Sequence, residues 1–180
     1  REQPVAIAAD IRKMYNSIFI EDLEQHCHRF LWRNLEDRQP DVYCIQRVNM
    51  GDRPASAIST EAIYITADLF QSDFPRVAEL LRTSTYVDDI VDSVESLRVA
   101  ETLAVDTEYV LKEAGFKIKS WQFSTEASPR VDPSVIPDSV EAHSTIKVLG
   151  ISWCPATDSL HYSPTLNFSK KKRGVYSQSN

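Results

Sequence analysis

The sequence has few glycines and cysteines and no long apolar segment. Its four glycines are scattered, so there is no glycine-rich loop of the kind that cradles phosphates. Cys27, Cys44 and Cys154 are an odd number without paired spacing. This pattern argues against a zinc site and a disulfide framework, and it favours a reducing compartment. No apolar run approaches the ~20 residues of a membrane span, and no signal peptide is evident. We therefore expect a soluble chain that is not secreted.

Positive charge is also scarce, because the formal net charge at pH 7 is −6. Phosphate contacts normally need a basic surface, so this balance counts against a free-standing nucleic-acid binder. The basic run at residues 170–173 has two interpretations: a solvated tail, or the start of a basic surface that lies in other parts of a longer protein. The length of 180 residues is enough for one domain with a buried core.

Two adjacent acids, Asp88 and Asp89, stand between β-branched runs at residues 83–87 and 90–94. Aspartate favours turns because it bonds its own backbone, so the pair predicts a hairpin tip, with solvated turn charges as the plainer interpretation. Asp10 ends an apolar run, and neighbouring strands lie about 5 Å apart. If these strands are neighbours, three carboxylates converge at one sheet edge. Such a cluster repels itself unless it binds divalent cations, as two-metal sites for phosphoryl transfer do.

The first half of the chain alternates strand and helix patterns. Residues 5–10 predict a buried strand, and the acidic residues 21–24 predict the start of a short helix. Residues 30–33 and 42–48 predict a long, half-exposed hairpin. Pro54 then suits the first turn of a helix. Apolar residues recur at helical spacing in that helix, at Ile58, Ala62, Ile65 and Leu69.

The second half completes a recognisable order. A short helix around Val77, Leu80 and Leu81 leads into the acidic hairpin. Ser96 can cap a second long helix that Gly115 stops, and residues 116–121 alternate as a strand with one wet face. The apolar face of that helix is predicted to hold Leu97, Ala100, Ala104, Leu111 and Ala114. With the hairpin treated as an insertion, the order is βαββαβ, an antiparallel sheet with two helices on one face.

The C-terminal third is less regular. Residues 125–144 carry three prolines and few large apolar residues, which predicts a connecting loop. Residues 147–153 predict one strand, followed by a turn at residues 155–158 and a return strand near residues 160–162.

Four blocks, in this order and spacing, resemble the palm of a reverse transcriptase, most closely that of the BEL/Pao group of long-terminal-repeat retrotransposons. They are residues 8–15 (AADIRKMY), residues 30–33 with 43–48 and 50–51, residues 86–89 (YVDD), and residues 115–121 (GFKIKSW) with 148–153 (VLGISW). The resemblance spans roughly residues 5–158. It implies an α+β polymerase palm of βαββαβ order with a fingers-type hairpin insertion.

The resemblance implies RNA-directed DNA polymerase activity, a nucleotidyl transfer of dNTPs to a primer 3′-hydroxyl. Asp10, Asp88 and Asp89 would be the catalytic acids. Asp10 and Asp88 would be the main ligands of two Mg²⁺ ions, with Mn²⁺ as an alternative. Asp89 would be a supporting ligand or a charge that shapes the pair, and the backbone carbonyl of Ile11 would add an oxygen. Positioning and charge stabilisation carry most phosphoryl transfer, which fits a site of carboxylates.

Further residues match the family's substrate contacts. Tyr15 would lie under the incoming sugar and exclude a 2′-hydroxyl, although packing at the base of the next helix explains it equally well. Lys119, or less favourably Lys117, would approach the triphosphate, although a solvated wet face is the plainer interpretation. Met50 and Gly51 would contact nucleotide or template, and Tyr86 and Val87 the primer end. The primer grip would consist of Leu149, Gly150 and Trp153, with ordinary strand packing as the alternative for Leu149 and Trp153.

The same resemblance divides the chain and predicts its partners. Residues 1–124 would be the palm core with part of the fingers (hairpin about 28–48), 125–144 a connecting loop, 145–165 a primer-grip hairpin, and 166–180 the start of a thumb or a tail. The chain would be a fragment, incomplete at both ends, of a polyprotein with fingers, thumb, ribonuclease H, protease and integrase. Its partners would be a primed RNA or DNA template and dNTPs, without a membrane. Its location would be intracellular, in cytoplasmic virus-like particles.

Two other hypotheses stay open. The chain can be a catalytically inactive or domesticated retroelement relic that serves as a binding or structural module. It can also be an unrelated acidic α+β domain whose hairpin happens to end in two acids.

Overall fold

The computed structural model describes residues 2–124, 146–149, 151–155 and 158–161. Its elements in chain order are β1 (Val5–Ile11), α1 (Met14–Ser17), α2 (Asp22–Gln25), the 3₁₀ turn η1 (His26–His28), β2 (Arg29–Trp32), β3 (Asp41–Cys44), α3 (Ala55–Phe70), α4 (Pro75–Thr83), β4 (Thr85–Tyr86), β5 (Asp89–Val94), α5 (Leu97–Glu113), β6 (Ile118–Phe123), β7 (Ile146–Val148), β8 (Ile151–Cys154) and β9 (Ser159–His161).

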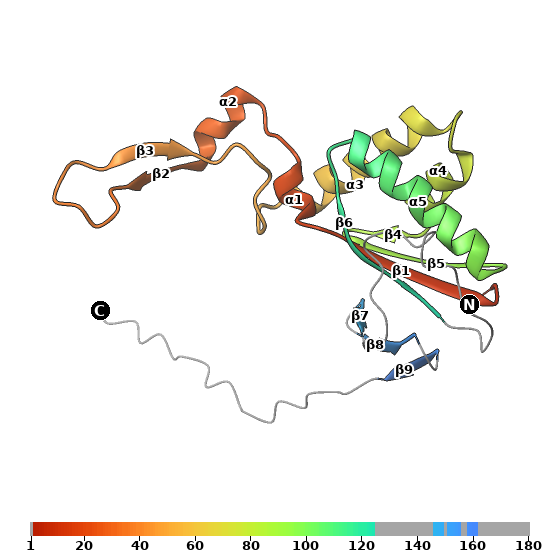
Figure 1. Cartoon of the computed structure of the whole chain (residues 1–180). Coiled ribbons are helices and arrows are strands. Elements are labelled where there is room, and N and C mark those ends of the chain that lie inside the picture. The colour runs from red at the N-terminus through yellow and green to blue at the C-terminus, as the bar shows by residue number, and fades with distance from the viewer. Residues whose placement is uncertain (1, 125–145, 150, 156–157, 162–180) are drawn as a thin grey trace, which may run out of the picture.

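A four-stranded antiparallel sheet in the order β4-β5-β1-β6 organises the structure. Helices α3, α4 and α5 lie on one side of it, and β7, β8 and β9 lie on the other (Figure 1). The predicted α+β class and the predicted succession of strands and helices are confirmed. Strands β5 and β1 are the central pair, because each has a neighbouring strand on both sides. Residues at the ends of these two strands are therefore held firmly in place.

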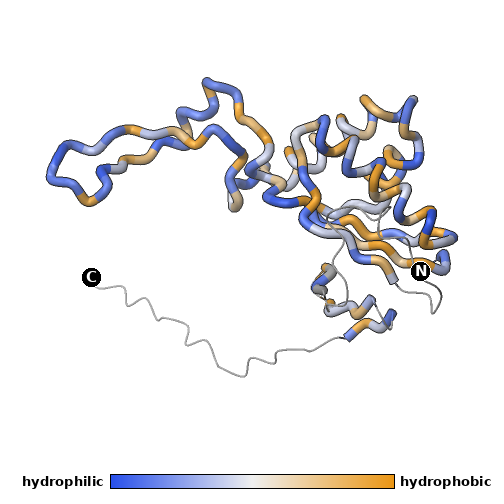
Figure 2. The backbone as a smooth tube through the Cα atoms, in the orientation of Figure 1, coloured by the Kyte–Doolittle hydropathy of each residue, from blue (hydrophilic) through white to orange (hydrophobic). Residues whose placement is uncertain are grey.

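The core lies between the sheet and the helices. Alternate residues of β1, namely Val5, Ile7 and Ile11, are fully buried in it together with Leu111 of α5. Figure 2 shows the apolar colour concentrated along the sheet and the helices that cover it. Because strand side chains alternate between faces, Ala6, Ala8 and Asp10 belong to the sheet face away from the helices. The acid at the end of β1 therefore points away from the core.

Helix α5 has the predicted ends. The hydroxyl oxygen of Ser96 accepts a hydrogen bond from the Val99 N–H at 3.4 Å, which caps the first turn. At the other end Gly115 has φ +85°, and the N–H groups of Gly115 and Phe116 bond the carbonyls of Lys112 and Leu111. This pair of bonds is a Schellman C-cap, which favours glycine because of its left-handed backbone. The cap turns the chain directly into β6.

Helix α3 forms as predicted, but it buries a different face from the one that its apolar spacing indicates. Its buried side chains are Ala55, Ser59, Ile63, Thr66 and Ala67. Ile58, Ile65 and Leu69 are exposed at 40%, 50% and 73%, while Ala62 packs partly against the core. Small residues allow the helix to approach its neighbours closely, and the Ser59 and Thr66 hydroxyls are satisfied by the carbonyls of Ala55 and Ala62.

The predicted hairpin between β2 and β3 forms and projects away from the sheet and helices (Figure 1). Its strands are shorter than predicted, at residues 29–32 and 41–44. It is also more exposed than predicted, because every residue of the two strands except Cys44 is exposed. The rings of Phe30 and Tyr43 stack across the strands at a centroid distance of 5.6 Å.

The single strand predicted for residues 147–153 is wrong. The chain reverses between β7 and β8, where Val148 and Ile151 are register partners, and Leu149 takes a left-handed φ of 49°. The sequence did not predict this reversal, because apolar residues occur on both sides of the turn and resemble one continuous strand. The return strand β9 is confirmed, pairing with β8. The predicted loop at residues 125–144 and the predicted thumb or tail at residues 166–180 lie outside the described residues.

None of the helices in the described part of the chain combines the length and the apolar composition required to cross a bilayer.

Candidate functional site

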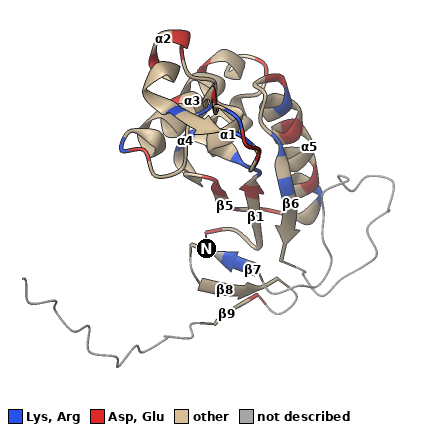
Figure 3. Ribbon diagram, turned by 90° about the vertical axis from the view of Figure 1, so that its left-hand side faces the viewer, with Lys and Arg blue, Asp and Glu red and all other residues tan. Residues whose placement is uncertain are grey.

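The register of β1 and β5 sets Asp10 directly opposite Asp89. Directly opposed residues of an antiparallel pair point to the same sheet face, with Cβ atoms about 4.5–5.5 Å apart. Both acids therefore lie on the face away from the helices, at the end of the central strands. Figure 3 shows acidic colour at this end of β1 and β5. The predicted proximity of the β1 acid to the acidic hairpin is confirmed.

The turn itself is displaced by one residue from the predicted position. Tyr86 and Asp89 are register partners, so the two-residue loop consists of Val87 and Asp88, and Asp89 already belongs to β5. Val87 takes φ 55°, which is unusual for a β-branched residue. The backbone carbonyl of Asp88 accepts a hydrogen bond from the Ile11 N–H at 2.7 Å. This bond fixes the hairpin tip against the end of β1.

A β-bulge on β6 completes the arrangement. Ala9 pairs with Trp121 and Ile11 with Ile118, so three steps along β6 match two steps along β1. The extra residue therefore stands opposite Asp10, at Lys119 and Ser120. Bulges are frequent beside active sites because they redirect side chains. The charge of Lys119 acts on the Asp10 carboxyl. Its expected approach to a triphosphate stays a prediction.

The three acids influence one another electrostatically. Burial raises the pKa of the Asp10 carboxyl above its usual value, and the charge of Asp88 adds to this, while the Lys119 charge opposes it. Burial also raises the pKa of Asp89, where a hydrogen bond from the backbone of Leu149 opposes the rise and the charges of Asp88 and Asp10 reinforce it. The charged forms of Asp10 and Asp89 are thus destabilised by their place in the fold.

These carboxylates match the hard oxygen ligands that Mg²⁺ takes in proteins. Among the described residues, however, no group of three or more His, Cys, Asp or Glu is arranged to hold a metal ion, so the predicted convergence of three carboxylates is not found. The Asp89 Oδ2 atom instead accepts a hydrogen bond from the Leu149 N–H at 3.4 Å. The donor chemistry therefore fits a divalent cation, while the side-chain positions would have to change to bind one.

Several residues predicted to touch substrate gather at the same place. Tyr86, Val87, Asp88, Asp89 and Leu149 line one pocket of about 460 Å³. Tyr86 and Leu149 are exposed there at 68% and 54%. Ile11, by contrast, is fully buried and does not line this pocket, so the metal-binding role implied for its backbone carbonyl stays a prediction.

Other predicted residues lie elsewhere. The Tyr15 hydroxyl is 3.2 Å from the Ser56 hydroxyl on α3, which matches packing at the base of that helix. Met50 and Gly51 occupy the turn before α3. Gly51 has φ +104°, a backbone conformation that favours glycine, and no other part of the described chain lies within 4 Å of a Cβ placed there. The predicted approach of a nucleotide or template to Gly51 stays a prediction. Gly150 lies outside the described residues.

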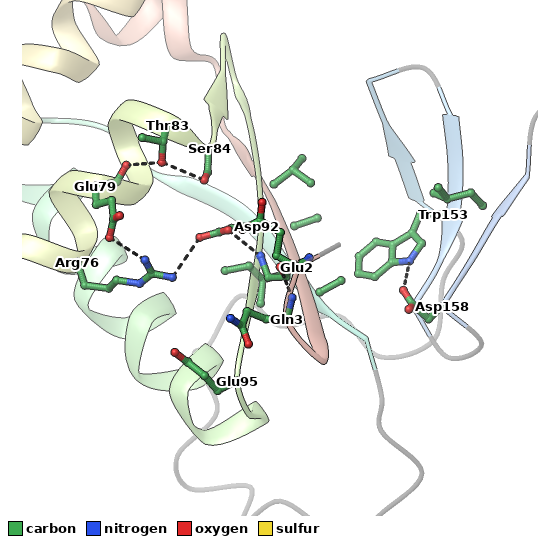
Figure 4. Close-up of a pocket in the computed structure, with 16 residues that line it drawn as sticks. Glu2, Gln3, Arg76, Glu79, Thr83, Ser84, Asp92, Glu95, Trp153 and Asp158 are labelled. Carbon is green, nitrogen blue, oxygen red and sulfur yellow. Dashed lines mark hydrogen bonds and ion pairs between the residues drawn. The ribbon is translucent and has the colours of Figure 1, made fainter.

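Trp153 is buried rather than presented to a ligand. Its side chain is 5% exposed, and its indole N–H donates to the Asp158 Oδ1 atom at 3.1 Å. It is one of the lining residues of a pocket of about 940 Å³. Arg76 of α4 and Asp92, which also line this pocket, lie 3.6 Å apart on the other side of the strands from Trp153 (Figure 4). Ordinary packing, the alternative given for Trp153 from the sequence, accounts for its position.

Sequence reasoning missed two contacts at the acids, the bulge at Lys119 and Ser120 and the bond from Leu149 to Asp89. The alternation of residues in a strand does not reveal a bulge. A hydrogen bond from a backbone N–H cannot be recognised in a sequence either, because every residue except proline has that group. Comparison with known proteins adds no further guide, since no model of a known protein family and no curated protein sequence matches the chain.

Proposed function

We propose that this chain is the palm part of an RNA-directed DNA polymerase of the BEL/Pao retrotransposon type, which transfers nucleotides from dNTPs to a primer 3′-hydroxyl. The observation that carries the proposal is the register that sets Asp10 opposite Asp89, with the Asp88 carbonyl bonded to the Ile11 N–H. The order of the four sequence blocks supports it, because the acids of two separate blocks come together on neighbouring strands.

The proposed metal ligands are Asp10 and Asp88, and the chemistry would come from two divalent cations. Such ions lower the pKa of an attacking hydroxyl and neutralise a triphosphate. The burial that raises the pKa of Asp10 and the repulsion among the acids give the site a reason to take up cations. Asp10 and Asp89 face away from the core, so a ligand can reach them without unfolding the sheet.

The surrounding residues have distinct proposed tasks. Lys119, on the bulge of β6, would hold a negatively charged phosphate group beside Asp10. Tyr86, which is exposed beside the acids, would support the primer end. Both tasks concern position and charge, which dominate catalysis of phosphoryl transfer. The net charge of −6 implies that most backbone contacts to nucleic acid come from other parts of the polyprotein.

The direct test is primer extension with Mg²⁺ on an RNA template, using the polyprotein segment that joins this chain to its fingers and thumb. Asp88→Asn removes one charged ligand and keeps the side-chain shape. We expect synthesis to fall by at least about 10²-fold, the usual cost of deleting one electrostatic group that stabilises a transition state. The fold should be unchanged by circular dichroism.

The matched control is Asp92→Asn. Asp92 lies in β5 three residues after Asp89, on the sheet face opposite to that of Asp10 and Asp89, beside Arg76 (Figure 4). It should retain synthesis at the level of the unmodified protein. Equal activity of the Asp88→Asn and unmodified proteins would refute the proposal. A folded protein that has no activity in either form would favour the retroelement relic instead.

A further inference from the structure

Two hairpin tips that are distant in the sequence meet at the acids. The turn between β7 and β8 brings the Leu149 N–H to 3.4 Å from the Asp89 Oδ2 atom, across 60 positions in the sequence. Leu149 and the acidic turn also line the same pocket. A carboxylate oxygen is a strong acceptor for a backbone N–H. This contact links the sheet directly to the small β7–β8–β9 sheet.

Both tips hold strained backbones at this contact. Val87 and Leu149 take φ values of 55° and 49°, in the left-handed region that non-glycine residues rarely adopt. Strained residues of this kind persist where the surrounding structure fixes them, and they cluster at ligand sites. The Ile11 bond to the Asp88 carbonyl fixes the first tip. The Asp89 carboxylate, which accepts from the Leu149 N–H, fixes the β7–β8 tip.

The three acids therefore stand in different situations. Asp89 has one carboxylate oxygen bonded to the second hairpin, while Asp10 faces Lys119 and Asp88 occupies the turn between β4 and β5. We propose that Asp89 is a positioning residue, whose carboxylate holds the β7–β8 tip beside the site, and that Asp10 and Asp88 alone bind the metal ions. This rests on the proposed function, because it assigns separate roles within that site.

In this arrangement Leu149 contacts the primer, and Asp89 only holds Leu149 in position. Leu149 is 54% exposed in the pocket beside Tyr86, so its side chain can contact a primer end that lies over the acids. Release of the Leu149 N–H would let the tip move away. Loss of Asp89 should therefore weaken primer binding more than it slows the chemical step, and it should leave the metal requirement unchanged.

The test compares Asp89→Asn with Asp89→Ala. Asparagine keeps an oxygen that can accept from the Leu149 N–H, whereas alanine removes the acceptor. We expect Asp89→Ala to raise the KM for primer–template about 10- to 100-fold, as the loss of one hydrogen bond to a charged group would. Asp89→Asn should restore most of this loss, and the Mg²⁺ concentration for half-maximal activity should be the same in both variants.

Hydrogen exchange supplies a readout that does not need catalysis. The amides of residues 146–154 should exchange faster in Asp89→Ala than in the unmodified chain, and at an unchanged rate in Asp89→Asn and in the control Asp92→Ala. Equal exchange in Asp89→Ala and the unmodified chain would overturn the proposal. So would an Asp89→Asn variant that needs more Mg²⁺ and loses as much synthesis as Asp88→Asn. If the protein proves inactive, hydrogen exchange alone tests whether Asp89 holds the β7–β8 tip. That result does not depend on the proposed function.

Discussion

The sheet-and-helix body and the β2–β3 hairpin use similar side chains in opposite ways. In the body, Leu111 and Trp121 are fully buried, whereas in the hairpin Leu31 and Trp32 are exposed at 64% and 54%. An isolated two-stranded hairpin is marginally stable in water, and a sheet with covering helices is stable by itself. The body therefore supplies the stability of the described fold, and the hairpin contributes surface.

The largest expected effect is the loss in free energy of unfolding when a buried leucine of the body is shortened. Leu111→Ala removes a side chain with no exposed surface. The free energy of unfolding should fall by about 2–5 kcal/mol, the usual cost of a core cavity of this size. The matched control is Leu31→Ala, which should change it by less than about 0.5 kcal/mol. Urea denaturation measures both. Similar losses in the two variants would mean that the hairpin is packed as firmly as the body.

A smaller effect is expected at the start of α5. Ser96→Ala removes the hydroxyl that accepts from the Val99 N–H, which leaves an orphan donor in the first turn. The expected loss in free energy of unfolding is about 1 kcal/mol. Ser96→Asp keeps an acceptor and should stay close to the unmodified chain in the same urea experiment. A loss with aspartate as large as with alanine would argue against capping.

The body was the more predictable region because its patterns are local. The serine that caps α5, the glycine that ends it and the apolar run of β1 each indicate structure through nearby residues, and each is confirmed. The buried face of α3 was not predictable in this way. Three large apolar residues at helical spacing stay exposed, since close packing of small residues such as Ala67 decided the contact instead.

At the candidate site, the sequence predicted the meeting of β1 with the acidic hairpin, but not the details that define its chemistry. Adjacent aspartates indicate a turn without fixing its register, and the register decides that Asp89, in β5, opposes Asp10. The contact from Leu149 depends on a turn within an apolar run, where the sequence predicted one strand. Tertiary contacts of this kind leave no periodicity.

The acids should reduce the stability of the body at neutral pH. Burial raises the folded-state pKa of Asp10 above 3.8, so the folded chain binds the proton more tightly than the unfolded chain. Stability should then decrease as the pH rises from 3.8 through the folded pKa, since the unfolded state binds fewer protons in that window. Asp10→Asn does not titrate, so its melting temperature should exceed that of the unmodified chain at pH 7.

This difference in melting temperature should shrink as the pH falls to 3, where both states of Asp10 are protonated. Asp37→Asn, in the exposed loop of the hairpin, removes one carboxylate away from the acids and is the control for the loss of a charge. An Asp10→Asn variant that is less stable than the unmodified chain at pH 7 would contradict the expected cost of holding the acids together.

The smallest effect on stability is expected from Trp32, where the comparison of the two regions can be checked optically. Trp121 and Trp153 are 0% and 5% exposed, so Trp32 is the tryptophan that an ion in solution can reach. Trp32→Phe should abolish most iodide quenching of tryptophan fluorescence while it changes the free energy of unfolding by less than about 0.5 kcal/mol. Persistent quenching would mean that a body tryptophan is open to solvent. Loss of quenching together with a large loss of stability would instead mean that the hairpin ring is packed, and the separation between a stabilising body and a presented hairpin would fail.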